Sequence, residues 1–123
     1  MPARASVGRR APTRPPAPDR GDLVWIDFEP HAGHEQAGRR PGLVLSPRAF
    51  NERLDRMWAC PITSTVRDSP FEVRLPPDCP IRGVVLVDQL RVFDLTARNV
   101  KTEQAAPPGV VADALAKARA ILA

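Results

Sequence analysis

From residue 21 onward, the apolar residues of this chain fall into short runs separated by prolines, glycines and polar segments. Short apolar runs with such boundaries predict β-strands rather than helices. The first run shows the alternation of a strand, because Val24, Ile26 and Phe28 would share one face. The predicted strands are residues 22–29, 42–45, 58–63, 71–75, 83–87 and 90–95.

Two segments have helical spacing instead. In residues 48–54, Phe50 and Leu54 lie one helical turn apart, which predicts a short helix that turns both side chains toward the core. Residues 108–123 predict an amphipathic C-terminal helix, with Val111, Leu115, Ala118 and Leu122 along one side. The fold class is therefore mainly β with a C-terminal helix, built on a small, strongly curved antiparallel sheet or barrel.

The excess positive charge is confined to the N-terminus. The chain has 123 residues and a net charge of +4, which suits one domain. The first 20 residues contain five arginines and one aspartate, so residues 21–123 have no net charge. Residues 1–20 are also rich in proline, which predicts a disordered basic tail before a domain at 21–123. The tail is either a loose polyanion-binding arm or a solvated extension, so a specific nucleic-acid site has to come from the domain.

The composition excludes several classes of protein. Cys60 and Cys79 form no CxxC pair, so they predict packing residues in a reduced, cytoplasmic protein rather than a disulfide scaffold. No apolar run is long enough to span a membrane. His31 and His34 precede Glu35 in one segment, but they lack a second ligand cluster, so we expect no metal or other cofactor.

Six blocks of sequence occur in a characteristic order: GDLVWIDFEP at 21–30, EQAGRRP at 35–41, VLSP at 44–47, PIT at 61–63, PFEV at 70–73 and DQ at 88–89. Each block alone is a weak signal. As an ordered set, they resemble the MazF/PemK (Kid) family of toxin endoribonucleases. The resemblance covers the chain from residue 21 to the C-terminus and leaves out only the tail.

The resemblance implies an SH3-like small β-barrel of the CcdB/PemK type, and a homodimer. It also implies sequence-specific, metal-independent cleavage of single-stranded RNA, inhibited by a cognate antitoxin protein. In this family the 2′-hydroxyl attacks the adjacent phosphate and leaves 2′,3′-cyclic phosphate and 5′-hydroxyl ends.

Two positions match the catalytic residues of the family. Arg40, held by Pro41, matches the arginine of the Arg-Pro motif. Its planar guanidinium suits a phosphate, and its high pKa favours charge stabilisation over proton donation. Thr63 matches a threonine that contacts the scissile phosphate, although a strand threonine can also bond the backbone at a turn.

Glu35 is the third catalytic candidate, with two open interpretations. It is either the general base, if its pKa is raised, or a loop brace paired with Arg39 or Arg40. A base replaced by glutamine would lose rate but keep RNA affinity, whereas a brace would lose both.

Further residues are predicted to contact RNA. They are Arg39, Arg67, Asp88, Gln89 and Trp25, the last by stacking on a base. Some family members pair an aspartate at position 88 with an arginine two residues earlier, but Leu86 stands there in this chain, which favours a mechanism centred on Arg40.

The alternatives keep the fold and remove the chemistry. A related barrel, CcdB, poisons DNA gyrase by binding alone, and a quiet RNA-binding or protein-binding module is a further possibility. The Arg40-Pro41 and Thr63 blocks favour the nuclease.

Overall fold

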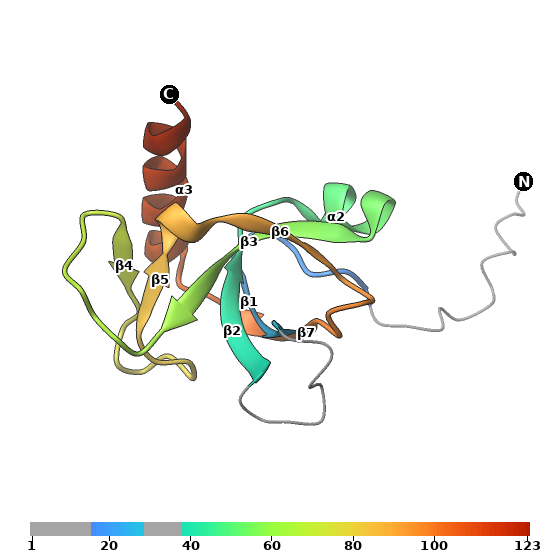
Figure 1. Ribbon diagram of the computed structural model, residues 1–123, viewed down its shortest axis with the longest axis horizontal. Helices are drawn as coiled ribbons and strands as arrows, with labels where there is room; N and C mark the ends of the chain where they lie inside the picture. Colours follow the sequence, from blue (N-terminus) through green and yellow to red (C-terminus); the bar gives the residue numbers. More distant parts are fainter. Residues whose placement is uncertain (1–15, 29–37) are drawn as a thin grey trace, which may run out of the picture.

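The computed structural model describes residues 16–28 and 38–123, and these residues form a curved antiparallel sheet flanked by two helices (Figure 1). The helices are α2 (Arg48–Leu54) and α3 (Pro108–Leu122), with a short 3₁₀ helix, η3 (Val87–Gln89). The strands are β1 (Asp22–Asp27), β2 (Arg39–Val44), β3 (Arg56–Thr63), β4 (Glu72–Arg74), β5 (Val84–Leu86), β6 (Arg91–Asp94) and β7 (Lys101–Ala105). The predicted β fold with a C-terminal helix is confirmed.

The sheet is organised around β3. Its strand order is β4-β5-β3-β2-β1-β7, and every pairing is antiparallel. One edge of β3 pairs with β2, while the other edge pairs first with β6 and then, near Thr63, with β5. Among the described residues these pairings form an open path, so closure into a barrel stays a prediction.

The two faces of the sheet carry separate apolar clusters, because successive side chains of a strand point to opposite faces. The larger cluster packs beneath α3, which stands above β4 and β5 in Figure 1, and it contains Leu23, Cys60 and Val85. Cys60 and Cys79 are buried free thiols, as packing residues should be. The smaller cluster on the opposite face consists of Val24, Ile26, Val44, Met57, Ala59 and Phe93.

Two local predictions fail. The helix at 48–54 forms with the predicted bounds, but Leu54 is 46% exposed and the buried residue of α2 is Asn51. Asn51 is buried because its side chain is fully hydrogen-bonded, which periodicity cannot reveal. Strand β7 was missed because its side chains are all exposed and carry no apolar alternation. No helix among residues 16–28 and 38–123 has the length and apolarity to cross a membrane.

The residues just before Gly21 pack on the domain. Asn51 Nδ2 donates to the carbonyl oxygen of Pro18 at 2.8 Å, and the Arg48 backbone N–H donates to Asp19 Oδ1 at 2.9 Å. The bond from the Arg48 backbone N–H, followed by that from the Arg20 backbone N–H, lowers the pKa of the Asp19 carboxyl. Residues 17–19, assigned to the tail by composition, thus make specific contacts with α2. Arg20 Nε donates to the Leu45 carbonyl oxygen at 2.7 Å, and residues 1–15 lie outside the described residues.

Candidate functional site

Arg40 and Thr63 lie at the same end of two neighbouring strands. The last pair of the β2–β3 ladder joins Gly42 to Pro61, and each candidate lies two residues beyond it. A Cβ on Gly42 would lie 2.9 Å from Ile26 Cδ1, so position 42 faces the smaller apolar cluster. Because residues two apart share a face, Arg40 and Thr63 both lie on the face of that cluster.

Arg39 and Arg40 are neighbours with opposite environments. Arg39 Nη1 forms an ion pair with Asp27 Oδ1 at 2.6 Å, and Nη2 donates to the Asn99 carbonyl oxygen at 3.2 Å. Arg40 is exposed, and its guanidinium has no hydrogen bond or ion pair within the described part of the chain. Arg39 therefore braces the start of β2, and its predicted RNA contact stays a prediction, whereas Arg40 is exposed and unpaired among the described residues.

The Thr63 hydroxyl combines both roles considered from the sequence. It accepts a hydrogen bond from the Thr65 backbone N–H at 3.2 Å, which is the turn-capping role of a strand threonine. A hydroxyl that accepts this bond still has its own proton to donate. Thr63 is half-buried, so that proton can reach a group bound at the end of β3.

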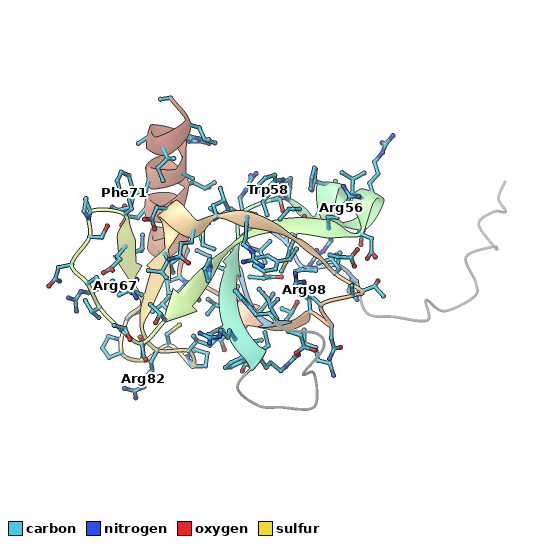
Figure 2. The ribbon with its side chains drawn as sticks, viewed as in Figure 1. Arg56, Trp58, Arg67, Phe71, Arg82 and Arg98 are labelled. Atoms are coloured by element: carbon cyan, nitrogen blue, oxygen red, sulfur yellow. The ribbon has the colours of Figure 1, made fainter. Side chains whose placement is uncertain are left out.

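The loops beside Thr63 carry exposed arginines. The Glu72 carboxylate accepts hydrogen bonds from the backbone N–H groups of Arg67 and Asp68 at 3.1–3.2 Å, which shapes the loop after β3. The Arg67 side chain itself is exposed, and Figure 2 shows it on this loop, with Arg82 on the loop between β4 and β5.

Two further residues that were predicted to contact RNA, Asp88 and Gln89, lie away from Thr63. Asp88 and Gln89 are exposed on η3, which follows β5 at its far end, since Val84 rather than Leu86 pairs with Thr63. Their RNA contacts stay predictions. Asp88 instead lies close enough to Cys60 for its charge to act as the second cause, after burial, that raises the pKa of that thiol to about 12.

Trp25 lies on the other face of the sheet from Arg40. Its ring packs against the larger cluster, its indole N–H donates to Glu103 Oε1 at 3.0 Å, and its register partners are Pro41 and Lys101. This arrangement supports a packing role, and base stacking stays a prediction.

Arg91 and Arg98 were not found from the sequence. The Arg91 guanidinium lies 5.2 Å from the Phe28 ring centroid and 4.7 Å from that of Phe93, which is a cation–π arrangement. Arg98 donates to the carbonyl oxygens of Asp27 and Phe28, and so holds the end of β1. Both residues lie far from β1 in the sequence, so no local pattern signals that they reach the end of that strand.

The third catalytic candidate, Glu35, lies outside the described residues, as do His31 and His34. Residues 16–28 and 38–123 contain no group of three histidine, cysteine or acidic side chains that could hold a metal ion.

Comparison with known proteins identifies the family of this chain. Residues 19–122 match the model of the PemK-like, MazF-like toxin of type II toxin-antitoxin systems. The chain belongs to this toxin family. It is 40% identical over 91 residues to the endoribonuclease toxin MazF of Escherichia coli, covering 74% of this chain and 81% of that protein. It is 42% identical over 109 residues to the endoribonuclease toxin ChpB of the same organism, covering 85% and 93%.

Solved structures of MazF agree with the fold. The crystal structure of MazF from Deinococcus radiodurans is 47% identical, with a TM-score of 0.77, over 86% of this chain and 96% of that one. The MazE–MazF complex from the same organism is 42% identical, with the same TM-score, over 86% and 95%. The described strands and helices therefore form a MazF-like fold.

Proposed function

We propose that this chain is a sequence-specific endoribonuclease toxin that cleaves single-stranded RNA without a metal ion. The observation that carries the proposal is the Arg40 guanidinium, which is exposed and has no carboxylate partner among the described residues, at the same sheet end as Thr63. The similarity to proteins named endoribonuclease toxins supports the reaction class.

The reaction needs stabilisation of charge more than it needs a nucleophile from the protein. The RNA 2′-oxygen forms a bond to the adjacent phosphorus as the bond to the 5′-oxygen breaks. The 2′-hydroxyl proton is removed, and the leaving 5′-oxygen gains one. The products are a 2′,3′-cyclic phosphate and a 5′-hydroxyl. The phosphate oxygens gain negative charge in the transition state, and preorganised donors there lower the barrier.

Arg40 and Thr63 supply such donors. The guanidinium donates two parallel hydrogen bonds to the phosphate, and the Thr63 hydroxyl donates to a non-bridging phosphate oxygen. Glu35 is proposed as the residue that removes the 2′-hydroxyl proton. The Glu35→Gln variant tests this role, because a base predicts a lower rate with RNA affinity unchanged.

The family also suggests partners. Solved structures contain MazF bound to MazE. We therefore propose that a cognate antitoxin protein binds this chain and blocks access of RNA to Arg40 and Thr63. A homodimer and a cytoplasmic location complete the proposal.

The test uses long single-stranded RNA with EDTA. We expect wild-type protein to give discrete fragments with 5′-hydroxyl ends, and Arg40→Ala to leave the RNA intact. RNA that stays intact with the wild type, both with and without EDTA, would refute the nuclease and favour a gyrase-binding toxin or a non-catalytic binding module. Cleavage that disappears on addition of EDTA would refute the metal-independent mechanism.

A further inference from the structure

Gly83 brings Arg82 close to the end of β3 at Thr63. A Cβ on Gly83 would lie 2.1 Å from the Thr63 carbonyl oxygen and 3.2 Å from Ser64 Cα, so only glycine allows this approach. Its φ of +122° also favours glycine. The next residue, Val84, pairs with Thr63 in the sheet. The backbone of Arg82 is therefore fixed one residue from the contact with Thr63.

The side chain of Arg82 is available for a ligand. It is exposed, and no carboxylate or carbonyl within the described residues binds its guanidinium. In Figure 2 it extends away from the body of the molecule at the end of the β4–β5 loop. Arg74, two strands' width from β3, is by contrast paired with Asp68 at 3.2 Å.

The unpaired arginines are not evenly distributed. Six described arginines have side chains that form no hydrogen bond, ion pair or ring contact with the described residues. Three of them lie on the segments that meet at the end of β3: Arg40 on β2, Arg67 on the loop after β3, and Arg82 on the loop before β5. Exposed like charges repel one another, and a bound polyanion offsets this repulsion with its negative charge. The other three are Arg53, Arg56 and Arg119.

We propose that Arg82 binds an RNA backbone phosphate next to the scissile one, on the β5 side of Thr63. The inference rests on the proposed function, because it extends the same RNA site. Arg82 is then an affinity residue that carries no sequence information, since phosphate contacts position the strand while base contacts specify it. A guanidinium binds a phosphate through two parallel hydrogen bonds, which an ammonium reproduces only in part.

Arg56 provides a matched control. It is an exposed arginine without a contact at the other end of the same strand, about 23 Å from Thr63 at about 3.3 Å per residue. Arg56→Ala and Arg82→Ala remove the same charge from the same protein. Any difference between them reports position rather than net charge.

The experiment measures two properties of wild type, Arg82→Ala, Arg82→Lys and Arg56→Ala. The first is the Kd, over a range of salt concentrations, for a single-stranded RNA that carries 2′-O-methyl groups and so cannot be cut. The second is cleavage of the unmodified RNA in EDTA. We expect Arg82→Ala to raise Kd about tenfold and to reduce the slope of log K against log salt by about 0.7, the value for one phosphate on a single strand. Arg82→Lys should fall between, and Arg56→Ala should stay within about twofold of wild type.

The outcomes separate the two proposals. If the wild type cleaves RNA, and Arg82→Ala matches Arg56→Ala in Kd and salt slope, the Arg82 inference is wrong and the nuclease stands. If the wild type binds without cutting, and Arg82→Ala binds more weakly than Arg56→Ala, the phosphate contact of Arg82 stands, but the nuclease fails and with it the placement beside a scissile phosphate. If the wild type neither binds nor cuts RNA, both are wrong.

Discussion

The two ends of β3 differ in how their polar groups are satisfied. At the Arg56 end, the strand pairs with β6 over four residues. There Ser46 Oγ donates to Asn51 Oδ1 at 2.6 Å and accepts from the Trp58 backbone N–H at 2.8 Å, inside the protein. At the Thr63 end, the ladder with β2 has stopped. Arg39 is paired with Asp27 there, but Arg40, Arg67 and Arg82 have no carboxylate partner among the described residues.

This difference separates the part of the sheet that stabilises the fold from the part available for a ligand. Buried polar groups have to find partners within the protein, because each unsatisfied one costs about 1–3 kcal/mol. Exposed cations do not carry this cost because water solvates them, so they can remain unpaired in the free protein and bind a phosphate. Four pairs of variants test this division.

Gly83→Ala should be the most disruptive substitution. The new Cβ would overlap the Thr63 carbonyl oxygen, and the backbone at φ +122° is strained for alanine, so we expect a loss of about 3 kcal/mol in the free energy of unfolding. Gly109→Ala is the control, because nothing lies within 4 Å of its Cβ and it is in the first turn of α3. It should stabilise by about 0.5 kcal/mol. Equal effects in urea unfolding would contradict the close contact.

Asn51→Ala should be the next largest. It removes an acceptor for Ser46 and donors to the Pro18 and Ser46 carbonyl oxygens, all in a buried setting. We expect a loss of about 2 kcal/mol, measured by urea unfolding. Glu52→Ala, on the exposed side of the same helix, should change stability by less than about 0.5 kcal/mol. An Asn51 effect as small as that of Glu52 would show that the network is not a stabilising one.

Arg39 and Arg74 allow a comparison of two ion pairs. The Asp27 carboxylate that Arg39 binds is only 14% exposed, whereas Asp68, the partner of Arg74, is 83% exposed. We expect Arg39→Ala to cost about 1–2 kcal/mol, because it leaves a mostly buried charge unpaired, and Arg74→Ala less than about 0.5 kcal/mol. If Arg74→Ala lowered the stability more than Arg39→Ala in thermal unfolding, Arg39 would not be the residue that braces β2.

Cys60 predicts a pH dependence. Burial, and then the negative charge of Asp88, raise the pKa of its thiol from 9.0 to about 12. Because the pKa of the thiol is higher in the folded than in the unfolded state, its contribution to stability is fully present below the unfolded pKa. That contribution is lost as the pH rises toward the folded pKa. We expect the contribution of Cys60 to fall by about 1 kcal/mol between about pH 9 and pH 10. The Cys60→Ala variant should lack that part of the slope; identical slopes would place the thiol in solvent.

The sequence predicted the elements whose signal is local. Alternation and helical spacing identified six strands and both helices, because each depends on neighbouring residues. Strand β7 could not be predicted, since it is held by backbone pairing with β1 and buries none of its side chains. The buried Asn51 depends on Pro18 and Ser46, and periodicity does not encode such partners.

The same reasoning applies to the candidate site. Arg40 and Thr63 were predicted through motifs, and the antiparallel register then put them at one sheet end. Arg82 carried no motif. Its place follows from the Gly83 contact with Thr63, which joins two segments far apart in the chain. Arg39 shows the converse, because its partner Asp27 is on another strand and could not be inferred from the sequence around it.

The central claim is that the Arg40 guanidinium acts on the scissile phosphate. Its direct test is the single-turnover rate of RNA cleavage, with protein in excess, for wild type, Arg40→Ala, Arg40→Lys and Arg56→Ala. We expect the rate to fall about 100- to 1000-fold for Arg40→Ala, to recover in part for Arg40→Lys, and to equal that of the wild type for Arg56→Ala. An Arg40→Ala protein that cleaves RNA as fast as Arg56→Ala would contradict it.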